Sequence, residues 1–155
     1  MSEILWCADN GDGTYRNPVL YCDYSDPDAI CVNGTYYLTA STFNYVPGLP
    51  IFTSCDLVNW KLRNYAVKNI PEARYAAPQH AQGIWAPAIR FQNGRFYIYY
   101  GMPDEGIYMV STENPLGDWD TPVLVKPGKG LIDPCPFWDD DGRAYIIHGY
   151  AKSRI

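Results

Sequence analysis

The sequence lacks the features that mark membrane, secreted and nucleic-acid-binding proteins. No stretch approaches the roughly 18 consecutive apolar residues that a membrane-spanning helix needs, and the first residues show neither the basic start nor the apolar core of a signal peptide. Acidic residues outnumber basic ones, 17 against 12, which gives a net charge of −5. Nucleic-acid-binding proteins instead concentrate Lys and Arg. We therefore expect a cytoplasmic protein without a membrane or nucleic-acid partner.

Paired cysteines and helical periodicity are lacking as well. The five cysteines are odd in number and have no paired spacing (Cys7, Cys22, Cys31, Cys55 and Cys135). This pattern favours buried or partly buried thiols in a reducing compartment over a disulfide framework. In contrast, aromatic residues make up 15% of the chain, with 14 Tyr and 5 Trp. Such a composition is typical of a strand-rich globular protein with a surface suited to sugars.

One sequence pattern occurs three times along the chain. Each copy is an apolar run led by proline, an Asn-Gly or Asp-Gly dipeptide, and a second run rich in aromatic and apolar residues, at residues 26–37, 86–97 and 133–145. These dipeptides supply the positive φ angles that a type I′ turn needs, so each copy predicts a β-hairpin. The turn glycines Gly34, Gly94 and Gly142 are 60 and 48 residues apart. That spacing is close to one four-stranded blade of a β-propeller.

The segments after the first two hairpins support the blade interpretation. Third strands are predicted at residues 50–53 and 107–110, and each is followed by a Ser, a turn and a Trp (Trp60 or Trp119) that leads into a fourth strand. The third copy is not followed by predicted third and fourth strands before Ile155. The predicted organisation is an opening segment over 1–20, a first blade over 21–65, a second over 84–126 and the start of a third over 131–155.

This organisation predicts an all-β protein with about two and a half blades of a larger propeller. Closed propellers use roughly 4–8 blades, and an incomplete ring leaves edge strands unpaired. We therefore expect the chain to be the N-terminal part of a longer protein. The region 64–83 contains two prolines and no alternating pattern, and it is predicted to be a long loop on the functional face.

The residue before the repeated proline is the main candidate for a catalytic residue. It is Asp26 in the first copy, Ala86 in the second and Asp133 in the third. Equivalent positions of propeller blades lie at one height around the axis, so the two aspartates should meet over a shared cavity. An aspartate before proline can instead simply form a turn. Because Ala86 shows that the turn needs no carboxylate, the pattern favours a functional role for the two aspartates. Glycoside hydrolysis requires such a pair of carboxylates.

Four motifs, in this order, resemble glycoside hydrolase family 43. They are YRNPVL (15–20), YSDPDAI (24–30), GIWAP (83–87) and GLIDP (130–134), and the likeness covers nearly the whole chain. The resemblance implies a five-bladed β-propeller and an inverting β-xylosidase, α-L-arabinofuranosidase or endo-arabinanase. By this resemblance Asp26 is the general base that activates water. Asp133 then orients the general acid and raises the pKa of that acid as a neighbouring like charge.

The general acid that the resemblance implies has no counterpart here. In the family it is a glutamate of a later blade in a Glu-Gly-Pro-like setting, and the candidates Glu72, Glu105 and Glu113 lack that context. Losing this proton transfer typically costs about 10²–10⁴-fold in rate, so we expect the chain alone to be inactive or nearly so. No cofactor is expected, although some family members hold calcium in the central channel, with ligands that would lie beyond Ile155.

Four further residues are candidate sugar contacts. Trp85 lines the pocket by the resemblance, with packing between blades as the alternative. Phe43 and Asn44 follow the first hairpin, where the family often places an aromatic ring against the sugar. His80 lies on the loop that enters the second blade and could bond a hydroxyl, although a lone loop histidine is more often incidental.

Two functions of different classes remain open. The favoured one is a fragment of a glycosidase that degrades xylan or arabinan. The alternative is a non-catalytic carbohydrate-binding propeller, in which the two aspartates only hydrogen-bond sugar hydroxyls. Assembly of several copies into a closed ring is less favoured. The sequence leaves the choice of xylose or arabinose, exo or endo action, and the oligomeric state undetermined.

Overall fold

The computed structural model describes residues 6–151, which form ten β-strands and one short 3₁₀ helix. The elements are β1 (Asp28–Val32), β2 (Thr35–Thr39), β3 (Gly48–Ser54), β4 (Lys61–Val67), η1 (Ala73–Ala76), β5 (Trp85–Gln92), β6 (Arg95–Met102), β7 (Gly106–Thr112), β8 (Val123–Pro127), β9 (Leu131–Trp138) and β10 (Ala144–Tyr150). Within these residues, no helix has the length and apolar character to cross a membrane. The prediction of an all-β protein is confirmed.

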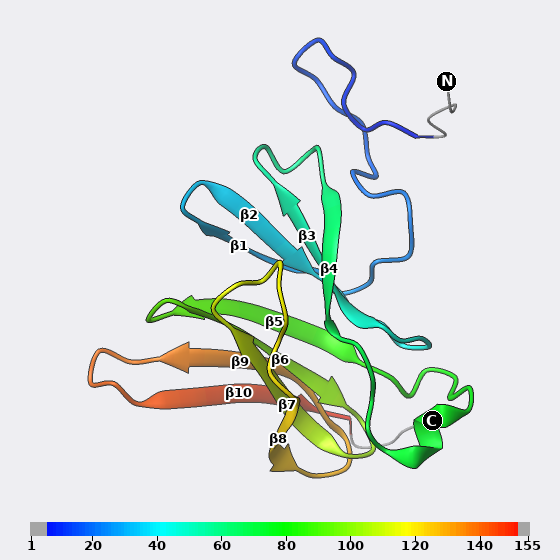
Figure 1. Ribbon diagram of the computed structural model, residues 1–155, viewed down its shortest axis with the longest axis vertical. Helices are drawn as coiled ribbons and strands as arrows, with labels where there is room; N and C mark the ends of the chain where they lie inside the picture. The colour runs from blue at the N-terminus through cyan, green and yellow to red at the C-terminus, as the bar shows by residue number, and fades with distance from the viewer. Residues whose placement is uncertain (1–5, 152–155) are drawn as a thin grey trace.

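The strands form three antiparallel sheets that lie next to one another (Figure 1). The first is β1-β2-β3-β4, the second is β5-β6-β7-β8, and the third is the pair β9-β10. The first strands of the three sheets lie side by side in chain order, since β1 contacts β5 and β5 contacts β9. Four-stranded sheets stacked in this way are the repeat unit of a β-propeller. Closure into a five-bladed ring stays a prediction.

The first two hairpins have the predicted turn. In both Asn33-Gly34 and Asn93-Gly94 the two residues have positive φ, at 50° and 79° in the first turn and at 49° and 80° in the second. A type I′ turn requires positive φ at both central residues. These turns align β1 with β2 from Asp28 to Val32, and β5 with β6 from Ala88 to Gln92, with an irregularity in the second pairing between Trp85 and Ala88.

The third hairpin differs from the predicted type I′ turn. Of its loop residues only Gly142 has positive φ, at 83°, and the Asp139 N–H donates to the Arg143 carbonyl at 2.9 Å. The loop therefore holds three residues rather than two. This register sets Tyr145 opposite Phe137, where the two rings stack at 6.4 Å. A three-residue hairpin loop commonly places a single residue in the left-handed region, and here Gly142 occupies that position.

The main hydrophobic core lies between the first two sheets. Its fully buried members include Leu49 and Ile51 of β3 and Ile89 of β5. A smaller cluster around Leu131 joins the second sheet to the third. The central strands β6 and β7 of the second sheet are thus covered on both faces. Large apolar side chains are exposed on β8 and on β9-β10, among them Val123, Leu124, Phe137, Ile147 and Tyr150.

Two predictions about local structure are wrong. All five cysteines are free and exposed rather than buried, because Cys31 and Cys135 occupy exposed positions of β1 and β9 and the other three lie outside the strands. The predicted loop 64–83 begins later than expected, since β4 continues to Val67. The reason is that Val67 is buried in the core between the sheets. Within the remaining loop, Ala73–Ala76 forms η1.

Candidate active site

The residue before the repeated proline has a left-handed backbone in all three sheets. The φ angle is 49° at Asp26, 30° at Ala86 and 53° at Asp133. Residues other than glycine rarely adopt positive φ, and such positions persist only where the surrounding structure holds them, often at functional sites. The shared conformation shows that the three positions are structurally equivalent.

Asp26 and Asp133 line one open cavity of about 450 Å³. The rest of its lining is Ser25, Phe43, Ala81, Trp85, Ala86 and Ile132. Both aspartates are exposed, so they are accessible to a ligand. The structure therefore brings together two carboxylates that are far apart in the sequence, and it places the predicted sugar contacts Trp85 and Phe43 beside them.

A buried serine holds Asp26 in place. The Ser41 hydroxyl donates to Oδ2 of Asp26 at 2.9 Å, and Ser25 donates to the same oxygen at 3.1 Å. The Ser41 oxygen also accepts the backbone N–H of Ala86 at 2.8 Å. One hydroxyl thus connects the first carboxylate to the start of the second sheet.

Asp133 lies beside the backbone of β10 instead. No hydrogen bond reaches its side chain within residues 6–151, but a Cβ at Gly149 would lie 3.2 Å from Oδ2 of Asp133. The pairing of β10 with β9 has an irregularity between Ile147 and Gly149, beside this carboxylate. Glycine therefore lets β10 pass close to Asp133. Neither aspartate accepts a backbone N–H in the described part of the chain, which argues against a purely turn-forming role.

Ser41 belongs to the repeat, although the sequence analysis did not single it out. It follows the turn glycine Gly34 by seven residues, and the same step from Gly94 and Gly142 leads to Gly101 and Gly149. A Cβ at Gly101 would lie 3.3 Å from the Cα of Ile132, immediately before Asp133. In each copy this position therefore lies close to the start of a sheet. Ser41 and Gly149 lie beside the start of their own sheets, and Ser41 and Gly101 lie beside the start of the next sheet. Extending the alignment beyond the hairpins could have found it.

A second connection joins the first strands of the sheets. Oδ2 of Asp28 accepts hydrogen bonds from the Arg90 guanidinium at 2.6 Å and from the backbone N–H of Ile89 at 2.9 Å. The same guanidinium donates to Sγ of Cys135 at 3.3 Å. These contacts link β1, β5 and β9, and they fix the strands that begin at the cavity. The signal in the sequence was a lone arginine in an otherwise apolar run.

The aromatic rings of the cavity wall are fixed as well. The indole N–H of Trp85 donates to the Ala81 carbonyl at 3.1 Å. Its ring contacts Phe43 edge to face, with centroids 5.3 Å apart and an interplanar angle of 80°. Rings held in this way provide a rigid apolar surface beside the carboxylates, which suits the C–H groups of a sugar ring.

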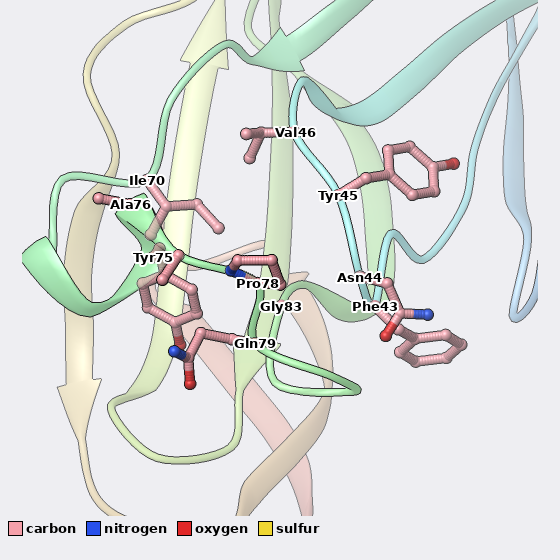
Figure 2. A pocket seen from close by; sticks show the side chains of 11 residues that line it. Phe43, Asn44, Tyr45, Val46, Ile70, Tyr75, Ala76, Pro78, Gln79 and Gly83 are labelled. Atoms are coloured by element: carbon pink, nitrogen blue, oxygen red, sulfur yellow. The ribbon is translucent and has the colours of Figure 1, made fainter.

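The other two predicted sugar contacts lie away from this cavity. Asn44 lines a neighbouring pocket (Figure 2), and its Oδ1 accepts the backbone N–H of Ala81 at 2.6 Å. His80 is exposed on the loop between η1 and β5, outside the lining of both pockets. A sugar contact by either residue stays a prediction.

The three candidate glutamates are engaged elsewhere. Glu72 accepts a hydrogen bond from the Tyr108 hydroxyl at 2.5 Å, Glu105 pairs with Arg74, and Glu113 pairs with Arg95. None of them lines the cavity. In the part of the chain that the structure describes, no cluster of three His, Cys, Asp or Glu residues could hold a metal ion.

Comparisons with known proteins point to one family. The sequence model described as "Glycosyl hydrolases family 43" matches residues 15–155. The chain is 45% identical over 140 residues to a protein of Xylanibacter ruminicola whose name places it among the β-xylosidases, covering 90% of this chain and 26% of that one. It is 36% identical over 151 residues to a non-reducing end α-L-arabinofuranosidase of Bacteroides ovatus, covering 92% and 28%.

A solved structure of the GH43 protein BlXynB from Bacillus licheniformis is similar in fold. The TM-score is 0.77 with 32% sequence identity, over 87% of this chain and 29% of that chain. The chain thus spans between a quarter and a third of the length of these relatives.

Proposed function

Because the chain belongs to glycosyl hydrolase family 43, we propose that the complete protein carrying it hydrolyses oligosaccharides derived from xylan or arabinan. The observation that carries this proposal is the cavity in which Asp26 and Asp133 meet beside fixed aromatic rings. The names of the relatives, a β-xylosidase and an α-L-arabinofuranosidase, support the substrate class.

In this proposal Asp26 is the general base. Both of its hydrogen bonds, from Ser41 and Ser25, end on Oδ2. Oδ1 therefore has no partner within residues 6–151 and can accept the proton of a water molecule that attacks the anomeric carbon. An inverting enzyme places such a base roughly 6.5–9.5 Å from the general acid, across the sugar ring.

The general acid comes, in this proposal, from a part of the complete protein outside this chain. Asp133 acts as the neighbouring negative charge that keeps the acid protonated, since a like charge raises a carboxyl pKa. Trp85 and Phe43 pack against the sugar. The chain alone then lacks leaving-group protonation and turns over at a rate lower by about 10²–10⁴-fold.

Replacing Asp26 by Asn in the complete protein tests this mechanism. Asn keeps the size of the side chain and an oxygen that accepts from Ser41, but it cannot take a proton. We expect hydrolysis of aryl xylosides and arabinosides to fall by about 10²–10⁴-fold, and we expect the wild-type product to have inverted anomeric configuration by NMR. The matched control is Asp23→Asn, at an exposed aspartate outside the cavity. Equal activity of Asp26→Asn and the control would refute the role of the base, and a retained configuration would refute inversion.

A second candidate is a non-catalytic carbohydrate-binding propeller. The three glutamates of this chain considered as acids make other contacts, so this candidate requires that the rest of the complete protein supply no general acid either. In that case the complete protein would bind xylo- or arabino-oligosaccharides without any turnover, and Asp26→Asn would weaken binding only.

A further inference from the structure

We propose that Arg74 is a positioning residue that fixes the Trp85 wall of the cavity relative to Asp133. This inference rests on the proposed function, in which Trp85 packs against the sugar and Asp133 keeps the general acid protonated. Arg74 lies in η1, within loop 70–83 between β4 and β5, and it is not among the residues that line the cavity. Its contacts reach the supports of both Trp85 and Asp133.

The carbonyl that holds Trp85 belongs to a residue with an unfavourable backbone conformation. Ala81 accepts the indole N–H of Trp85 at 3.1 Å and has a φ of 53°. A left-handed alanine persists only where the surrounding structure holds it. On one side, the N–H of Ala81 donates to Oδ1 of Asn44 at 2.6 Å. On the other side Ala81 is followed by Gln82, so the contacts that hold Gln82 also hold this wall.

Arg74 and Tyr75 hold Gln82 at two points. Nη1 of Arg74 donates to Oε1 of Gln82 at 3.0 Å, and Nη2 donates to the Tyr75 hydroxyl at 2.6 Å. That hydroxyl donates to the Gln82 carbonyl at 2.9 Å. Burial, followed by the charge of Glu105, raises the pKa of Tyr75, which keeps the hydroxyl protonated as a donor. The side chain and the backbone of Gln82 are therefore both fixed by residues of η1.

The same guanidinium is bound to the turn 103–105 between β6 and β7. It pairs with Asp104 at 3.0 Å and with Glu105, and both carboxylate side chains are only 16% exposed. Lys129 also pairs with Asp104, at 3.5 Å, but its side chain is 74% exposed. Partly buried ion pairs are screened by salt less than exposed ones, and removing one partner leaves the other charges unpaired. Arg74 is therefore the main link between η1 and this turn.

The turn 103–105 also supports the segment that leads to Asp133. The Gly130 N–H donates to the Pro103 carbonyl at 2.7 Å, and β9 begins with the next residue and carries Asp133. Because this hydrogen bond is made by the backbone, it remains when the side chain of Arg74 is replaced. Loss of the Arg74 side chain should therefore release the Trp85 wall while Asp133 stays in place.

A double-mutant cycle with Trp85 tests the inference. In the complete protein, Arg74→Gln removes the guanidinium, and Trp85→Ala removes the ring on which Arg74 acts. We expect Arg74→Gln to raise KM for aryl xylosides or arabinosides by about 3- to 10-fold. The value of kcat should stay nearly unchanged, because ring packing contributes to the binding of substrate and transition state alike. In the Trp85→Ala background, Arg74→Gln should raise KM by less than about twofold, since the two residues belong to one network.

Fluorescence gives a second measurement that needs no turnover. The difference in emission between each protein and its Trp85→Ala version isolates the emission of Trp85. Acrylamide should quench this emission more strongly after Arg74→Gln, because a released ring is more accessible to solvent. The matched control is Lys68→Gln, which removes the ion pair between the exposed Lys68 and Asp118 away from the cavity. We expect the control to leave both KM and quenching unchanged.

The outcomes separate this inference from the proposed function. Unchanged quenching of Trp85 after Arg74→Gln would overturn the inference, as would an equal rise in KM with and without the Trp85 ring. Absence of hydrolysis by the wild-type protein would instead refute the proposed function, and quenching would still test the role of Arg74. If Arg74→Gln lowers the unfolding temperature, Arg74→Lys, which keeps the charge but not the fork of donors, is read in the same way.

Discussion

The first and second sheets begin with the same backbone and present different side chains to one cavity. A proline follows a left-handed residue in both, with φ of 49° at Asp26 and 30° at Ala86. The first residue carries a carboxylate and the second a methyl group. The backbone conformation therefore belongs to the repeat and does not depend on the aspartate. The carboxylates of the first and third sheets are better explained by chemistry than by folding.

Among the changes that compare the sheets, giving the second sheet the aspartate of the first should have the largest effect on catalysis. We expect Ala86→Asp to fold normally, since Asp26 and Asp133 adopt the same conformation, and to lower kcat/KM by about 10- to 100-fold, or ~1.4–2.7 kcal/mol. The reason is that a third negative charge and a larger side chain enter the cavity. Hydrolysis kinetics of the complete protein measure this effect. Ala86→Asn is the control that separates size from charge. Unchanged kinetics for both variants would mean that the substrate does not approach Ala86.

Removing the hydroxyl that couples the two sheets should have a smaller effect on catalysis and a measurable effect on stability. Ser41→Ala leaves Asp26 without its buried donor and the Ala86 N–H without its acceptor. An unsatisfied buried group costs about 1–3 kcal/mol, so we expect the unfolding free energy to fall by that amount. Because Asp26 loses its orientation, kcat should fall more than KM rises. Urea unfolding and steady-state kinetics measure the two effects, and Ser41→Thr, which keeps the hydroxyl, should recover part of both. Wild-type behaviour of Ser41→Ala would show that the coupling is unimportant.

The turn after the third strand gives the smallest predicted difference between the sheets. In the first sheet, hydrogen bonds from the Asn59 side chain and from the N–H groups of Asn59 and Val58 hold the pKa of Asp56 well below its usual range. In the second sheet the equivalent residue is Asn114, which accepts the Leu116 N–H at 3.1 Å and carries no charge. The contribution of Asp56 to the first turn should therefore depend on pH, whereas Asn114 makes no such contribution to the second turn.

The sign follows from the lowered pKa of Asp56. Its stabilising contribution is fully present above the unfolded value of about 3.9 and is lost as the pH falls through the folded value. Unfolding midpoints measured between about pH 2 and 6 should decline less steeply for Asp56→Asn than for the wild type. The control is Asp140→Asn, at an exposed aspartate of the third hairpin loop. Parallel curves for wild type and Asp56→Asn would contradict the prediction.

Short-range signals were sufficient for much of the fold. The Asn-Gly dipeptides predicted the first two hairpins because the turn type depends on only two residues. The proline alignment predicted that Asp26 and Asp133 would share a cavity, because equivalent positions of a repeat fold alike. The third turn was mispredicted, because an Asp-Gly dipeptide also fits a three-residue loop in which only the glycine has positive φ, as Gly142 does here.

The sequence by itself determined the strand repeat, the first two turns and the equivalent positions of the two carboxylates. Only the tertiary structure decided that Ser41 joins Asp26 to Ala86, that Gly149 makes room for Asp133, and that loop 70–83 forms a pocket behind Phe43. The physical reason is the separation along the chain between the residues that interact. Turns and strand alternation depend on neighbouring residues, whereas these contacts depend on how separate segments pack, and no local pattern records that packing.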